Sequence, residues 1–175
     1  SLAVAHAVMV AVMAMTPVHL HGHGASLRLI GITISAHVAG MYACSPLFGL
    51  LADRVGRRWT LTLGFVVQLA SLGLLIAYGQ RDAAVVAALV LLGLGWSAAL
   101  VSCSALLIDA APATRRTHIQ GRSDFTMNIV GAAGGAVAGP IVHNWGMPTL
   151  ASLTGFLIIV AVVVLLPRVR DISMR

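Results

Sequence analysis

The chain has 175 residues, of which 59% are hydrophobic and only 9% are charged. Soluble domains carry roughly 25% charged residues, so this composition excludes a domain that covers its whole surface with polar side chains. The 11 basic residues are all arginine and lie between apolar runs, which favours membrane topology and argues against nucleic-acid binding.

Apolar runs long enough to cross a bilayer, about 20 residues each, occur six times. A helix satisfies its own backbone hydrogen bonds in lipid, and the alternating ten-residue segments of a membrane barrel are absent. The sequence therefore predicts an all-α polytopic membrane protein with six transmembrane helices. The expected spans lie near residues 1–18, 28–51, 59–79, 83–108, 122–143 and 147–167.

The first expected span contains a histidine, His6, and the pair Thr16-Pro17, which we expect to break the helix before its outer end. An imidazole inside a span is costly against lipid, so His6 should face the bundle or a cavity. There it could bind substrate or relay a proton, or it could simply bond to a backbone carbonyl.

The loop that follows the first span has three alternating histidines. They are weak candidates for Zn²⁺ or Cu²⁺, but no carboxylate or cysteine accompanies them and glycines flank them. A solvated, flexible loop is the preferred interpretation, so we assign no metal site. The three residues are His19, His21 and His23.

A stripe of four residues at helical spacing marks the second span. Its first member, His37, is open to the same interpretations as His6, a transport role or a bonded structural histidine. The stripe consists of His37, Met41, Cys44 and Phe48. Cys44 and Cys103 lack any ligand spacing, so we expect both to be buried free thiols.

The second span ends in the charged stretch GLLADRVGRR, residues 49–58. Gly49 would let another helix approach closely, and Gly56 would permit a sharp turn. Asp53 could accept from a neighbouring helix N-terminus or pair with an arginine. Arg57 and Arg58 could reach carboxylates or helix C-termini on adjacent spans.

The fourth span closes with Asp109 on the side of the charged stretch, so Asp109 is expected to pair with Arg57 or Arg58. Such a pair at a wet membrane edge contributes ~1 kcal/mol or less to stability, and its value would lie in favouring one conformational state.

The fifth span carries a stripe of polar and small residues: Asp124, Asn128, Gly131 and Gly135. The glycines are expected to pack against another helix, and Pro140 to bend the end of the span. Asp124 lies near the end of the span, where pairing with a loop arginine is expected. Asn128 lies deeper and is the better candidate for a substrate contact.

The arginines divide unequally between the two sides of the membrane. Nine fall on one side, and Arg28 and Arg81 fall on the other. By the positive-inside rule both termini are therefore expected to be cytoplasmic. The nine are Arg54, Arg57, Arg58, Arg115, Arg116, Arg122, Arg168, Arg170 and Arg175.

The charged stretch resembles the signature loop between the second and third helices of each half of a major facilitator superfamily transporter. The matching positions are Gly49, Leu51, Asp53, Arg54, Gly56, Arg57 and Arg58. The stretch GAAGGAVAGP, which ends in Gly139-Pro140, is similar to the family's glycine-rich fifth-helix motif. The fourth span lacks the arginine usual in the N-terminal half, and a short basic tail follows the sixth. The chain is thus similar to helices seven to twelve.

This resemblance implies a half bundle built of two three-helix units, with residues 49–58 and Asp109 forming a conformational gate. It implies a secondary transporter that moves a small molecule by alternating access, in a plasma or bacterial inner membrane, together with a second six-helix half. The chain begins inside an apolar run without methionine, so we expect a fragment or half of a larger protein. His6, His37, Asp124 and Asn128 are the candidates for its transport path.

We expect no cofactor and no enzymatic activity, because enzyme signature motifs are lacking. The partners expected are the lipid bilayer, the second half and the substrate. The main alternative is a self-standing six-helix protein that assembles as a homo-oligomeric channel or scaffold. An integral-membrane enzyme is a more remote alternative.

Overall fold

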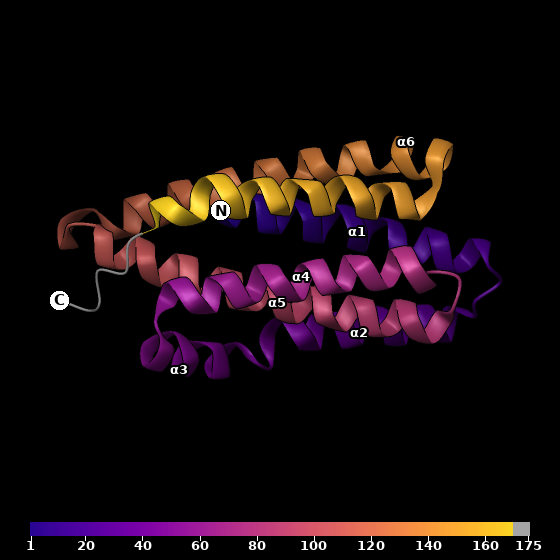
Figure 1. The fold of residues 1–175 in the computed structure, drawn as a ribbon, viewed down its shortest axis with the longest axis horizontal. Coiled ribbons are helices and arrows are strands. Elements are labelled where there is room, and N and C mark those ends of the chain that lie inside the picture. Colours follow the sequence, from indigo (N-terminus) through magenta and orange to yellow (C-terminus); the bar gives the residue numbers. More distant parts are fainter. Residues whose placement is uncertain (170–175) are drawn as a thin grey trace.

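Long helices lie side by side along one axis in the computed structural model, which describes residues 1–169 (Figure 1). Within these residues there is no strand, so the predicted all-α fold is confirmed. The elements are α1 (Leu2–Gly22), α2 (Leu27–Tyr42), α3 (Ser45–Val55), α4 (Arg57–Tyr78), α5 (Asp82–Ala110), η1 (Ala113–Arg115), α6 (Arg116–Leu165) and η2 (Leu166–Arg168).

Five helical segments of the described chain are long and apolar enough to cross a membrane, where six separate spans were predicted. The difference lies in α6, whose 50 residues include the fifth and sixth expected spans. A straight helix of that length would extend ~75 Å, more than twice the thickness of a bilayer core. Instead Gly146 leaves helical geometry, with φ 79° and ψ 170°, and the chain doubles back there (Figure 1).

Two proline positions differ from expectation. The predicted break at Thr16-Pro17 is wrong, because α1 continues through Pro17. The Thr16 hydroxyl donates to the Val12 carbonyl at 2.8 Å, a side-chain bond of the kind that accompanies proline inside membrane helices. The second expected span is instead two helices, since α2 ends at Tyr42 and α3 begins at Ser45, just before Pro46.

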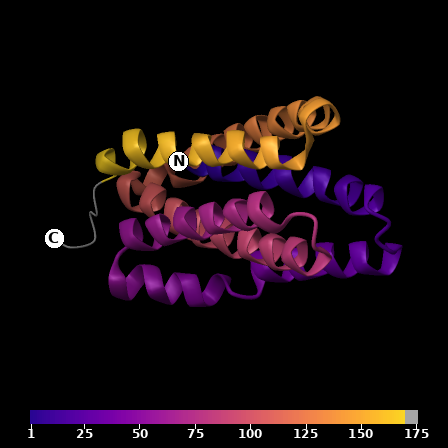
Figure 2. The same cartoon turned by 45° about the vertical axis from the view of Figure 1, so that its right-hand side comes forward.

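Apart from the joint between α2 and α3, the connections fall at two opposite ends of the bundle (Figure 1; Figure 2 gives a second view). One end has the start of α4 and η1, which contain Arg57, Arg58 and Arg115, and the other end has Arg28 and Arg81. The described arginines are thus divided as the sequence predicts, while Arg170 and Arg175 lie outside the described residues. We call the first of these the arginine-rich end. Which side of the membrane it faces remains a prediction.

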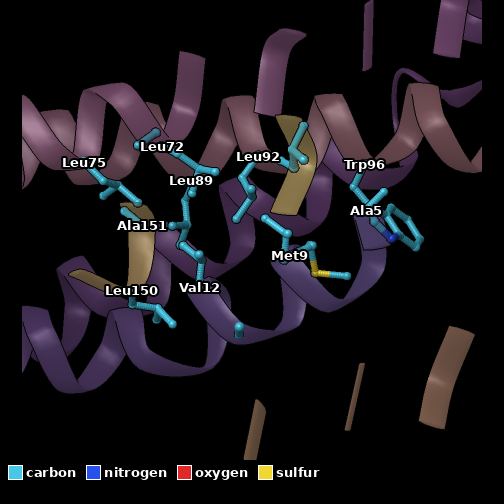
Figure 3. Packing of buried hydrophobic residues seen from close by; sticks show 14 of the residues in the cluster. Ala5, Met9, Val12, Leu72, Leu75, Leu89, Leu92, Trp96, Leu150 and Ala151 are labelled. Carbon is cyan, nitrogen blue, oxygen red and sulfur yellow. The ribbon is translucent and has the colours of Figure 1, made fainter. Parts of the chain in front are cut away.

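The core lies where α1, α4, α5 and the second part of α6 meet (Figure 3). Met9 and Val12 of α1 pack there with Leu89 and Leu92 of α5, and all four are buried. Large apolar side chains also cover the outside, with Trp59 63% exposed. Such a surface suits lipid as the surrounding solvent.

Glycines let α5 lie very close to α2 and α4. A Cβ at Gly93 would lie 2.5 Å from the His37 carbonyl oxygen, and one at Gly64 would lie 2.7 Å from the Gly95 carbonyl oxygen. Small residues at such crossings bring the backbones of membrane helices into contact. These contacts hold α2 and α4 firmly against α5, which carries Asp109 and Trp96 at the sites described next.

Candidate functional site

The charged stretch forms a sharp turn at the arginine-rich end. Gly56 joins α3 to α4 with φ 106° and ψ 144°, a left-handed conformation that favours glycine. Its carbonyl accepts from the Thr60 hydroxyl at 3.1 Å, which fixes the start of α4. The predicted role of Gly56 in the turn is confirmed. The turn places Arg57 on the inner side of the bundle.

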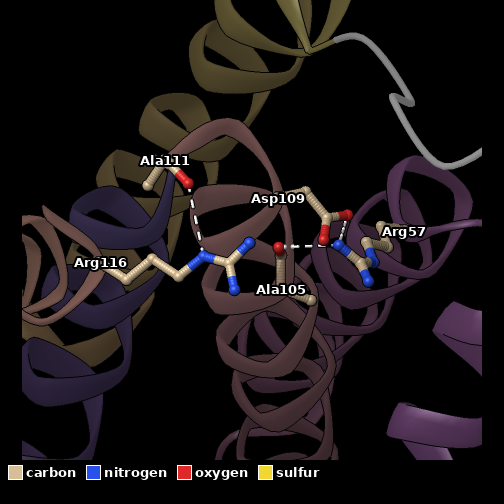
Figure 4. A network of polar contacts seen from close by, with 5 residues as sticks. All are labelled: Arg57, Ala105, Asp109, Ala111 and Arg116. Atoms are coloured by element: carbon tan, nitrogen blue, oxygen red, sulfur yellow. Dashed lines mark hydrogen bonds and ion pairs between the residues drawn. The ribbon is translucent and has the colours of Figure 1, made fainter. Parts of the chain in front are cut away.

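Arg57 joins the start of α4 to the end of α5 (Figure 4). Its guanidinium forms an ion pair with Asp109 and donates from Nη1 to the Ala105 carbonyl at 2.8 Å. The side chains of Arg57 and Asp109 are 17% and 27% exposed, so the pair is partly shielded from solvent. A cation at a helix C-terminus is also favoured by the helix dipole. The predicted pairing of Asp109 is confirmed as a contact.

The other charges of the stretch point away from the bundle. Asp53, Arg54 and Arg58 are exposed, and no ion pair forms for them among the described residues. A Cβ at Gly49 would meet nothing within 4 Å, so the close helix approach expected at Gly49 does not occur within residues 1–169. Asp53, Arg54 and Arg58 form one exposed edge of the bundle, which we call the Asp53 edge.

A second polar group lies inside the bundle. The Trp96 indole Nε1–H donates to His6 Nδ1 at 3.0 Å, which links α5 to α1. Tyr42 of α2 meets the Trp96 ring edge-on, with ring centroids 6.1 Å apart. His6 is half-buried and rests against Gly131 of α6. The prediction that His6 faces the bundle is confirmed.

His37 is fully buried, and its Nδ1 lies 2.7 Å from the Leu89 carbonyl oxygen, so this nitrogen carries a proton and donates. The contact agrees with the structural interpretation of this histidine. Its Nε2 has no hydrogen-bond partner among the described residues. The other stripe members Met41, Cys44 and Phe48 are buried or half-buried.

Neither cysteine forms a disulfide, as expected, but Cys44 and Cys103 are half-buried and not fully buried. Both lie in or beside helices of the expected spans, where part of the surface faces outward. The expectation of free thiols is confirmed, and the expectation that both are buried is wrong.

The polar residues of the expected fifth span bond to groups of their own helix. Asp124 accepts from Gln120 Nε2 at 2.9 Å, and no arginine pairs with it in the described chain, so the expected arginine pairing is wrong. Asn128 is exposed and donates to the Asp124 carbonyl at 2.8 Å. A cavity of about 440 Å³ opens beside Asp124 and Arg116 at the arginine-rich end.

The glycine stripe of α6 packs on α1 as predicted, with Gly131 against His6 and Gly135 against Val10. A Cβ at Gly139 would meet nothing within 4 Å, so Gly139 makes no such contact within the described residues. α6 continues through Pro140, and its non-helical residue is Gly146, so the expected bend at Pro140 stays a prediction. The chain reverses at Gly146, whose positive φ favours glycine.

The outer histidines are ordered and do not form the expected flexible loop. His19 and His21 belong to the last turn of α1. His19 Nε2 lies 2.8 Å from the Gly79 carbonyl oxygen, and His23 Nε2 lies 2.7 Å from Gln80 Oε1. They join the end of α1 to the α4–α5 turn. No three potential metal ligands gather anywhere in residues 1–169.

Sequence reasoning missed two polar contributors to the interior. Gln68 is fully buried in α4 and donates to the Ala5 carbonyl at 3.1 Å, one residue from His6. A single amide within an apolar span was the available signal for it. Trp96 gave no such signal, because a tryptophan in a span is ordinarily a packing residue.

Comparison with known proteins agrees with this arrangement. The sequence model of the Major Facilitator Superfamily matches residues 1–173. Two uncharacterized MFS-type transporters of Bacillus subtilis, YddS and YdeG, are each 40% identical to the chain over 86% of its length. Riboflavin transporter RfnT of Brucella anthropi is 31% identical over 94% of the chain. The aligned chain covers 35%, 35% and 41% of these relatives. It is a multi-pass membrane protein, and it belongs to the major facilitator superfamily.

Proposed function

We propose that the chain forms one six-span half of a secondary transporter that carries a small molecule across a plasma or bacterial inner membrane. Residues 1–175 would act as a single domain. This domain would rock against a second half and expose a central path to each side of the membrane in turn. The observation that carries this proposal is that the charges of residues 49–58 face in two directions. Arg57 is fixed to α5, while Asp53 is exposed.

That division suits a gate between two bodies. A contact inside this chain would keep the turn rigid, and the exposed Asp53 edge would meet the second half in one state only. Only an interaction that differs between two states can shift their balance. On this proposal no residue has a catalytic role and no cofactor is required. RfnT makes riboflavin a reasonable first substrate to test, because that relative is named as a riboflavin transporter.

Exchange of Asp53 for asparagine tests the gate. In the complete transporter, Asp53→Asn should leave expression near normal but reduce substrate uptake into proteoliposomes about tenfold, the effect of losing ~1.4 kcal/mol from one state. Cysteine probes along α2 and α3 should become more accessible from the arginine-rich end. Asp82→Asn is the matched control, since Asp82 is also exposed but lies at the opposite end. If Asp53→Asn takes up substrate at the wild-type rate, Asp53 is only a solvated charge and has no role in a gate.

The proposed orientation has its own test. With both termini cytoplasmic, a cysteine at Ser26 should react with an impermeant thiol reagent in intact cells, and one at Thr114 should not. Both positions are exposed in the structure and lie at opposite ends of the bundle. The parent protein gives the background from Cys44 and Cys103. If Thr114→Cys is labelled and Ser26→Cys is not, the chain has the opposite orientation in the membrane.

A further inference from the structure

The link between His6 and Trp96 joins helices from distant parts of the chain. His6 lies in the second turn of α1, and Trp96 lies midway along α5. Trp96 is only 3% exposed, so its indole N–H has little access to water as an alternative partner. The 3.0 Å bond to His6 Nδ1 is therefore how this buried donor is satisfied.

The direction of this bond fixes the protonation state of His6. An indole nitrogen only donates, so His6 Nδ1 must hold a free electron pair. The imidazole is then neutral and carries its single proton on Nε2. When a proton from the aqueous phase adds to Nδ1, two N–H groups face each other and the bond from Trp96 is lost.

The imidazole has little space in which to adjust. A Cβ at Gly131 would lie 2.5 Å from His6 Cδ2 and 2.9 Å from its Nε2, so this edge of the ring rests on the α6 backbone. The opposite edge faces Trp96, whose ring Tyr42 meets edge-on. A charged His6 ring would lose its hydrogen bond from Trp96 and could not turn to another partner in this space. Movement of α1 away from α5 and α6 would separate the two N–H groups.

No ionisable group is among the polar contacts of His6 within the described chain, where its partner is the Trp96 indole. On α2, Tyr42 meets Trp96, and α4 contributes the neutral amide Gln68, which bonds to the Ala5 carbonyl. On α5 and α6, Cys103 and Asp124 lie two helical turns from Trp96 and Gly131 on the same faces. No ion pair involves His6 in residues 1–169.

We propose that His6 and Trp96 form a proton-operated latch, in which protonation of His6 releases α1 from α5 and thereby couples proton binding to the change between transport states. This rests on the proposed transport function, since the latch acts on the rocking of the two halves. It assigns His6 the role of proton acceptor and Trp96 the role of a positioning residue.

The test is ¹⁹F NMR of the complete transporter labelled with 5-fluorotryptophan. The Trp96 resonance is identified by its absence from Trp96→Phe. Between about pH 4 and about pH 8, a range that includes the one in which histidine ordinarily changes charge, it should shift along a single-proton curve. In His6→Gln, whose amide oxygen accepts but does not titrate, the Trp96 resonance should stay constant. His37→Gln should titrate like the wild type.

Two results would overturn the latch. One is a Trp96 resonance in the folded wild-type protein that does not move over this pH range, which needs no variant to interpret. The other is a His6→Gln variant that titrates like the wild type. The measurement requires no substrate, so a titrating Trp96 in a protein that fails to transport would reject the proposed function and leave the latch standing.

Discussion

Replacement of Arg57 by glutamine in the complete transporter is expected to lower the transport rate about tenfold or more, whereas Arg58→Gln should have little effect. Arg57 contacts both Asp109 and the Ala105 carbonyl, while Arg58 is exposed on the neighbouring position. A hydrogen bond that involves a charged group contributes about 1.5–3 kcal/mol. Without it the turn is no longer held rigid, so the Asp53 edge is displaced in the state in which it meets the second half. A loss of ~1.4 kcal/mol from that state changes the balance tenfold.

Initial uptake rates in proteoliposomes, normalised to the amount of folded protein, measure this difference. Asp109→Asn should resemble Arg57→Gln, and the double variant should be no worse than either, since both single changes break the same contact. The ion pair has no role in transport if the two single effects simply add. Equal rates for Arg57→Gln and Arg58→Gln would show that burial of Arg57 is unimportant.

Substitution of Gly64 by alanine is expected to lower stability by about 1–3 kcal/mol, the usual cost of overpacking. The added Cβ would lie 2.7 Å from the Gly95 carbonyl oxygen and 2.9 Å from the Ala99 amide nitrogen, both backbone atoms that cannot rotate away. Gly73 on the same helix has nothing within 4 Å of its Cβ position. Gly73→Ala should therefore be neutral or slightly stabilising, because alanine favours helix.

Thermal unfolding of the two variants in detergent, followed by the loss of monodisperse protein, compares them directly. The melting temperature of Gly64→Ala should fall by several degrees relative to Gly73→Ala. If the two melting temperatures agree, α4 and α5 do not depend on the close approach at Gly64.

Periodicity and local chemistry predicted the features that depend on neighbours in the chain. Apolar length located the helices, and Gly56 with Arg57 and Arg58 predicted a charged turn, as α3 and α4 confirm. The ion pair of Asp109 was also predictable, because the second and fourth spans end on the same side. The family match over residues 1–173 agrees with the resemblance carried by that turn.

Features that depend on packing could not be read from the sequence. Pro17 lies within α1 without breaking it, whereas α2 ends before Pro46, and both residues stand in similar apolar surroundings. The partners of His6 and His37 come from α5, more than 50 residues away in the chain. A donor such as the Trp96 indole is assigned to one acceptor only when the helices have been brought together.

The joint between α2 and α3 makes α3, which lies toward the arginine-rich end, a short lever. Ala52 is the one fully buried residue of α3, so the helix is anchored weakly compared with α5. From Ser45 to Val55 it extends ~16 Å, and a swing of ~10° about residues 43–44 would carry Asp53 through ~2 Å. A displacement of that size is enough to make or break a hydrogen bond, while His37 on the far side of the joint keeps its place. Asp53, near the end of α3, can thus shift while Arg57 stays fixed to α5.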